Sequence, residues 1–216
     1  MRIDQKQNLV FPVDTDQGTI YIHSTPISRE VFEKHYLVLG KTFSRIMTEG
    51  LTIIQGPNMA GLLLRDIAKE TTIPGRGGNA WDGPDGVEMT LFPEMRRLTN
   101  VVFSTPEGYQ TKPYEVARRD GTIDDDDAAA VENALAFFTL ASWGTRGQPA
   151  AIRSIHLGMK LLWAAEITLL NCVEFAASLT TLNVPATTTT ETSSEPSSRI
   201  LPAPVLATSS ANTIPI

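Results

Sequence analysis

Residues that could act as a catalytic base or hold a metal ion are few and scattered along the chain. The three histidines, His23, His35 and His156, lie far apart in the sequence, and none stands at the spacing typical of zinc ligands. The chain also has no Gly-x-Ser-x-Gly nucleophile turn. Because a nucleophile needs a base and an orienting group beside it, these residues do not predict catalysis. A lone histidine such as His35 is more typical of a surface or interface position.

Four consecutive carboxylates, Asp124–Asp127, form a run that could attract a cation. Calcium-binding loops, however, alternate their oxygen ligands and require a glycine bend, and this run has neither feature. Carboxylates at the start of a helix are stabilised by the unpaired N–H groups of its first turn. The run therefore predicts the capping of a helix rather than a metal site.

The segment Pro74–Gly86, PGRGGNAWDGPDG, is rich in glycine and could cradle a phosphate. It lacks the Gly-Lys-Ser/Thr ending of a phosphate-binding P-loop and does not follow a clear strand. We therefore interpret it as a flexible connection, in which Trp81 anchors the loop or a partner. An enzyme would need a polar pocket that combines Trp81 with Asp124–Asp127. We expect a non-enzymatic protein without a cofactor.

Composition bounds the possible partners. The chain has 216 residues, of which 42% are hydrophobic, and a net charge of −6, which suits one medium domain with appendages. The acidic balance argues against nucleic acid, because phosphate binding needs a basic face. Cys172 is the single cysteine and lies in an apolar stretch, so we expect a buried, reduced thiol.

No segment is typical of membrane insertion or secretion. The N-terminal residues lack the apolar core of a signal peptide. No run of about twenty apolar residues is present, because charged side chains interrupt the longest apolar stretch. The cytoplasm is the expected compartment, without a membrane partner.

The N-terminal region predicts a β-hairpin. Asn8–Val13 and Thr19–His23 are rich in Val, Ile, Phe and Tyr, and the turn-forming residues Asp14–Gly18 join them. A two-stranded hairpin is marginally stable by itself. We therefore expect it to pack on helices or to pair with another chain, with its edge as a candidate assembly surface.

Several amphipathic or proline-initiated helices follow. A helix capped by Thr25 or Ser28 has an apolar stripe at three- and four-residue spacing, formed by Phe32, Tyr36, Leu39, Phe43 and Ile46. A helix from Asn58 to about Glu70 is predicted to face inward with Met59, Leu62, Leu63 and Ile67. Pro93 and Pro113 each predict the start of a short helix. The segment Asn100–Phe103 could form either a strand or the end of a helix.

Two long apolar segments form the predicted centre of the fold. The first covers Ile123–Trp143, and its C-terminal half is apolar nearly all round. The second is predicted to be one helix from about Ala151 to Leu179, in which most polar side chains project onto one narrow stripe. The surplus apolar surface must be covered by neighbouring helices, by another subunit or by a client chain.

Composition changes at Asn183. The remaining residues are rich in Ser, Thr and Pro, contain no aromatic residue and predict disorder. The expected organisation is an N-terminal β-hairpin arm at 1–26, a helical domain at 27–182 and a low-complexity tail at 183–216. The predicted fold class is mainly α with a small N-terminal β-hairpin, a compact helical domain and a disordered C-terminal tail.

This layout resembles the tail assembly chaperones of long-tailed bacteriophages. The residues that carry the resemblance are GTIYIHSTPISREVF from Gly18, RRDGTIDDDDAAAVENALAFFTLASW up to Trp143, and NCVEFAASL, which ends at Leu179. Proteins of that family coat the helical tape measure protein before the tail tube polymerises. The resemblance implies self-association, binding of the tape measure or another virion protein, and a location in the host cytoplasm. It also implies a frameshift junction near Leu182–Pro185, after which a longer product would continue.

Surplus apolar helices and a hairpin able to pair are compatible with the capture of an apolar helical client. The candidate client or subunit contacts are the large aromatic residues Phe32, Tyr36, Phe43, Trp143 and Trp163; the sequence does not divide them between core and client. The main alternative is a structural protein of a phage capsid or tail, located in the virion, whose C-terminal tail wraps neighbouring subunits.

Overall fold

The computed structural model describes residues 7–16, 18–50, 55–73, 77–144 and 149–182. In these ranges the chain forms an antiparallel sheet of five strands in the order β4-β3-β2-β1-β5, together with seven helices. The strands are β1 (Asn8–Thr15), β2 (Gly18–Ser24), β3 (Thr99–Thr105), β4 (Gly108–Pro113) and β5 (Glu166–Thr168). The helices are α1 (Arg29–Thr48), α2 (Gly56–Glu70), α3 (Val87–Arg97), α4 (Tyr114–Arg119), α5 (Asp125–Gly144), α6 (Pro149–Trp163) and α7 (Cys172–Leu182).

The fold is therefore mixed α/β. The predicted predominance of helices is confirmed, but a five-stranded sheet replaces the single N-terminal hairpin that we expected. The hairpin itself is confirmed, since β1 and β2 pair in antiparallel register with Leu9 opposite Ser24. Part of each outer edge is occupied, because Asn8–Val10 of β1 pair with β5 and Tyr21–Ser24 of β2 pair with β3. Over these residues the hairpin edge is not the free assembly surface that we expected.

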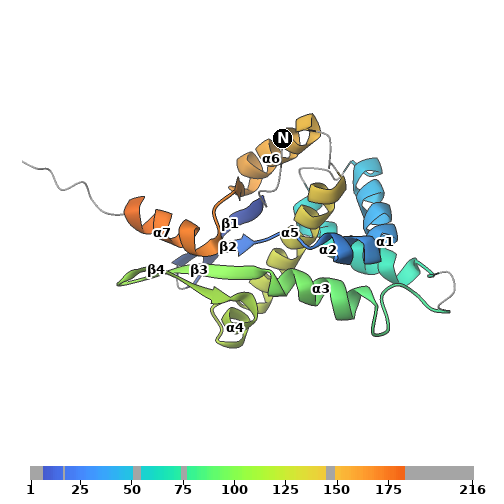
Figure 1. Cartoon of the computed structure of the whole chain (residues 1–216), viewed down its shortest axis with the longest axis horizontal. Helices are drawn as coiled ribbons and strands as arrows, with labels where there is room; N and C mark the ends of the chain where they lie inside the picture. Colours follow the sequence, from blue (N-terminus) through green and yellow to red (C-terminus); the bar gives the residue numbers. More distant parts are fainter. Residues whose placement is uncertain (1–6, 17, 51–54, 74–76, 145–148, 183–216) are drawn as a thin grey trace, which may run out of the picture. The chain divides into compact units, whose positions relative to one another are not determined.

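Helices lie on both faces of the sheet, and α7 covers one of these faces only in part (Figure 1). Alternation along the strands places Leu9, Ile22 and Val101 on one face, where they join the same buried core as the helices. The other face carries Tyr21 and His23, and both rings contact Phe175 of α7 at centroid distances of 5.8 and 6.1 Å. The sheet thus separates a large helical layer from α7.

Helix α5 lies at the centre of the helical layer. Val131, Leu135 and Phe138 are buried there, as the predicted helix at Ile123–Trp143 required. Helix α2 approaches α5 closely because two glycines face it: a Cβ at Gly56 would lie 2.5 Å from the ring of Phe137. The close packing fixes α2 on α5.

Helix α1 begins after Ser28, whose hydroxyl accepts a hydrogen bond from the Val31 N–H at 3.3 Å. Its buried face is rotated relative to the predicted stripe and consists of His35, Val38, Leu39, Thr42 and Ile46. The rotation is possible because the buried polar groups have partners: the Thr42 hydroxyl donates to the Val38 carbonyl at 2.8 Å. Tyr36 of the predicted stripe is 63% exposed instead.

Two other predicted helix details are also wrong. On α2, Leu63 and Ile67 are buried, but Met59 and Leu62 face outward because the small and branched residues Ala60 and Leu64 occupy the interface. Helix α3 begins after Gly86 and contains Pro93 in its interior rather than at its start. The ambiguous segment that follows is strand β3, and the helix predicted after Pro113 is confirmed as α4.

The predicted continuous helix from Ala151 to Leu179 is wrong. Helix α6 ends at Trp163, and Ala164 takes a left-handed backbone conformation with φ of 51°, which interrupts a right-handed helix. Strand β5 then pairs with β1. Helix α7 starts with a reciprocal cap: the Asn171 side-chain oxygen accepts from the Glu174 N–H at 3.0 Å, and the Glu174 carboxylate accepts from the Asn171 N–H at 2.9 Å.

All of the described residues belong to one compact unit, which extends over Met1–Val184. The predicted disordered tail at 183–216 lies outside the described residues. None of the helices in the described ranges is both long enough and apolar enough to cross a membrane.

Candidate functional site

The acidic run at the start of α5 caps that helix. The Asp124 carboxylate accepts a hydrogen bond from the Asp127 N–H at 2.7 Å, and the Asp124 carbonyl accepts from the Ala128 N–H at 3.0 Å. Burial and the neighbouring carboxylates of Asp124 and Asp126 raise the pKa of Asp127. This geometry confirms the capping prediction. Across the described ranges, no cluster of three or more His, Cys, Asp or Glu side chains is placed to hold a metal ion.

The histidines occupy three separate environments. His35 is buried rather than on the surface. Its Nε2 atom lies 2.7 Å from the Thr90 hydroxyl, so the buried ring has a hydrogen-bond partner. His23 is buried in the sheet, and its Nε2 atom lies 3.0 Å from the Leu170 carbonyl. His156 lies on α6, where partial burial lowers its pKa. No two histidines come together.

Trp81 packs against the protein itself. Its ring meets Phe92 of α3 edge-on at 5.8 Å, and the Lys69 ammonium lies 5.5 Å from the ring centroid. These contacts fasten the glycine-rich connection to α2 and α3. The structure therefore places Trp81 as a loop anchor.

One charged cluster was missed by sequence reasoning. The Glu132 carboxylate on α5 is buried and pairs with Arg65 of α2 and with Arg96 of α3, the latter at 2.7 Å. The Arg65 guanidinium also lies over the ring of Phe92 at 4.9 Å. The buried carboxylate is thus paired with two partly exposed arginines, and the cluster joins α2, α3 and α5.

The structure distributes the five predicted contact residues over several environments. Phe32 of α1 and Trp143 of α5 stack with a centroid distance of 4.3 Å and an interplanar angle of 9°, and both are half-buried. Phe43 is half-buried against the core, whereas Tyr36 is exposed on α1. Trp163 lies apart from these four, at the end of α6.

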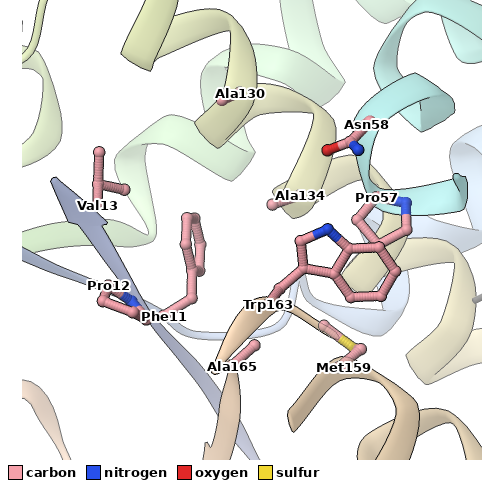
Figure 2. Close-up of a pocket in the computed structure, with 10 residues that line it drawn as sticks. All are labelled: Phe11, Pro12, Val13, Pro57, Asn58, Ala130, Ala134, Met159, Trp163 and Ala165. Carbon is pink, nitrogen blue, oxygen red and sulfur yellow. The ribbon is translucent and has the colours of Figure 1, made fainter. Parts of the chain in front are cut away.

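Trp163 lines an apolar cavity of about 200 Å³ between β1, α2, α5 and α6. Figure 2 shows Phe11 of β1 and Trp163 on two sides of the cavity, with Ala134 of α5 between them and Met159 of α6 next to Trp163. The small alanine side chains of α5 leave the space that the two aromatic rings border. A cavity of this kind accepts apolar groups.

Helix α6 is apolar on two opposite sides. Met159 and Trp163, four residues apart, face the cavity. Leu157 and Leu161, also four residues apart, point away from it and are 58% and 74% exposed. Further exposed aliphatic side chains follow the helix at Leu169, Leu170 and Val173. Leu169 and Val173 border the sheet face that carries His23 and Asn100, so they are treated apart from α6. We call Leu157 and Leu161 the outer aliphatic surface.

The outer aliphatic surface was not among the predicted contact residues. Sequence periodicity assigned the whole segment to one helix, in which these leucines could not be distinguished from core residues. The exposed positions emerge only because α6 and α7 are separate helices joined through β5.

No protein-family model, curated protein or solved structure matches this chain.

Proposed function

We propose that this protein is a non-enzymatic assembly chaperone that binds an apolar helical segment of a client protein through the outer aliphatic surface. In line with the sequence resemblance, the proposed client is a phage tape measure protein, held in the host cytoplasm before the tail tube assembles. Self-association of the chaperone on the client is part of this proposal.

The observation that supports the proposal most strongly is the exposure of Leu157 and Leu161 on one face of α6. Single exposed apolar residues are ordinary, but neighbouring ones mark interaction surfaces. An amphipathic client helix recognises such a face through side chains spaced three and four residues apart. The apolar inner side of the same helix, at Met159 and Trp163, holds α6 on the protein.

The charges near this surface suit a role in binding. Lys160 and Glu166 form an exposed ion pair at 2.9 Å next to the leucines. Exposed ion pairs contribute little to stability, so the pair can open to meet charges that flank an apolar stripe on a client. The polar clusters elsewhere, at Glu132 and Asp124, are used within the fold, which favours a non-enzymatic role.

The direct test uses a synthetic helical peptide with a leucine face, labelled with a fluorophore, and measures its anisotropy as the protein is added. We expect saturable binding, and about tenfold weaker binding by the Leu157→Ser/Leu161→Ser double variant, because two buried aliphatic contacts would be lost. The matched control is Met89→Ser, which removes an exposed apolar side chain on α3 and should leave binding unchanged.

Equal binding by the double variant and the wild type would contradict the proposed surface. Sedimentation of the protein alone provides a second measurement. If the outer aliphatic surface forms a stable contact only between copies of this chain, the alternative of a structural virion protein gains support.

A separate experiment addresses the phage assignment. The gene is expressed with its downstream DNA, and the intact masses of all products sharing the N-terminus are measured. A longer product that diverges near Leu182 would support the chaperone, whereas a single product ending at Ile216 would favour the structural alternative.

A further inference from the structure

The apolar cavity between β1, α2, α5 and α6 is bordered by two aromatic rings (Figure 2). Phe11 is buried, and the pairing of β1 with β2 places it opposite Ile22. Trp163 at the end of α6 is half-buried, and Met159 one turn earlier is buried beside it. The sheet therefore holds one wall of the cavity, and α6 holds the other.

Two alanines on α5 create the space between these walls. Ala130 and Ala134 lie four residues apart, so they share one face of the helix, and both line the cavity. A methyl group is the whole side chain at each position, which leaves a volume of about 200 Å³ unfilled. The atoms around an unfilled space lose the dispersion contacts that a partner would supply. An apolar occupant of the right size would restore these contacts.

The lining of the cavity excludes a charged ligand. None of the described residues that line it is Asp, Glu, Lys or Arg, so a charged ligand would lose its hydration without gaining a countercharge. The polar side-chain groups on the lining are the amide of Asn58 and the indole N–H of Trp163. The lining therefore favours an uncharged, mainly apolar ligand.

The volume and the walls of the cavity suit one aromatic ring. An apolar cavity of roughly 150 Å³ is large enough for benzene, so about 200 Å³ has room for one ring with a small substituent. Aromatic rings pack edge-on or offset against other rings, which Phe11 and Trp163 provide, and the thioether of Met159 makes favourable contacts with a ring. Asn58 and Ala130 on the lining are exposed, which gives a small ligand a path from solvent between α2 and α5.

We propose that this cavity is a binding site for a small, uncharged molecule with a single aromatic ring. The ring lies between Phe11 and Trp163, next to the alanines of α5, and contacts the Met159 thioether. The ligand is a free small molecule rather than a side chain of the client, because the outer aliphatic surface points away from the cavity. The site therefore does not depend on the proposed chaperone function.

The test titrates the full-length protein, labelled with ¹³C on its methionine methyl groups, with toluene. A bound aromatic ring shifts the NMR signal of a methyl group that it contacts, and Met159→Leu assigns the Met159 signal by its loss. We expect a saturable shift of the Met159 methyl signal, whereas the methyl signal of Met89, which is exposed on α3, should not move. Toluene should also raise the melting temperature, because it binds the folded protein and not the unfolded chain.

Two matched probes define the chemistry of the ligand. Benzoate has the same ring with a charge, and methylcyclohexane has the same carbon skeleton without aromaticity. We expect about tenfold weaker binding of benzoate, because its carboxylate would be left without a countercharge. Methylcyclohexane should bind about threefold more weakly than toluene, because it lacks the ring contacts. Binding of either probe as tight as that of toluene would overturn the proposal.

Two substitutions of the same kind on α5 localise the site. Ala134→Leu fills the cavity and should abolish the shift that toluene causes, whereas Ala129→Leu places the same side chain at an exposed position and should leave the shift unchanged. If Ala134→Leu does not fold, the comparison of the three probes on the wild-type protein still decides the question. Absence of a Met159 shift up to the solubility limit of toluene, or equal toluene affinity of Ala134→Leu and the wild type, would contradict the site.

A last comparison tests the source of the ring. N-acetylphenylalanine amide carries the same ring on a peptide backbone and is titrated in the same way as toluene. Equal or weaker binding of this compound supports a free small molecule as the ligand. Tighter binding than that of toluene would overturn this assignment in favour of an aromatic side chain of a polypeptide.

Discussion

On α2 and α5, Leu64, Val131 and Leu135 are at most 2% exposed, whereas on α6 Leu161 is 74% exposed. The two regions use similar aliphatic residues in different ways. In the helical body they fill a shared core. On α6 one side lines the cavity and the other remains uncovered, with Leu161 more exposed than the exposed apolar side chains of the body such as Met47 and Leu62.

The charged residues of the two regions also differ, because those of the body are partly buried and those of α6 are exposed. Glu132 is buried between two arginines from different helices, whereas the Lys160–Glu166 pair is exposed on both sides. The first arrangement joins three helices, and the second contributes little to the fold. The comparison assigns stability to the body, and the exposed side of α6 is where we propose that recognition takes place.

The largest expected difference concerns two leucines. Leu135→Ala should lower the free energy of unfolding by about 3 kcal/mol, because it leaves a cavity in the core. Leu161→Ala should change it by less than about 0.5 kcal/mol, because the side chain is exposed. Urea denaturation of both variants measures the difference. Similar losses of unfolding free energy for the two would contradict the distinction between the core and α6.

A second prediction concerns the charges. Glu132→Ala should destabilise the protein by about 2 kcal/mol, below the usual range for a buried pair, because both arginines retain access to water. Glu166→Ala removes one partner of the exposed pair and should cost less than about 1 kcal/mol. A larger loss for Glu166→Ala, again by urea denaturation, would show that α6 depends on its ion pair.

A third prediction tests the close packing of α2 on α5. Gly56→Ala should cost about 1–2 kcal/mol, because the added methyl group would collide with the buried ring of Phe137. Gly40→Ala on α1 meets open space and should stabilise the helix by about 0.5–1 kcal/mol. Thermal unfolding should therefore move in opposite directions for the two variants.

The smallest predicted effect is a pH dependence. Burial holds the pKa of His23 below its ordinary value of 6.5, so the unfolded chain binds a proton at a higher pH than the folded protein. Stability should consequently fall as the pH is lowered from about 7 towards about 5. His23→Gln should reduce this slope in melting experiments at several pH values; an unchanged slope would exclude His23 as its source.

Local patterns predicted the elements that depend on local chemistry. The hairpin followed from two β-branched runs around a turn, and α5 from its capping aspartates and apolar period. Strands β4 and β5 were not predicted, because β5 has only three residues and β4 is largely polar. Their formation depends on pairing with strands that are distant in the sequence. The start of α7 did have a signal, the reciprocal cap at Asn171 and Glu174, whereas the left-handed Ala164 had none.

The candidate site was predicted only in outline. The surplus of apolar residues between Ala151 and Leu179 indicated a covered or binding surface. Its division into an inner side with Trp163 and an outer side with Leu161 depends on where β1 and α5 lie, which periodicity does not encode.

The most direct test of the proposed recognition surface is amide hydrogen exchange of the whole chain with and without the leucine-faced helical peptide. We predict increased protection confined to α6, with α2 and α5 unchanged. Protection that appears instead on α1 to α3, or no change anywhere at saturating peptide, would contradict the account.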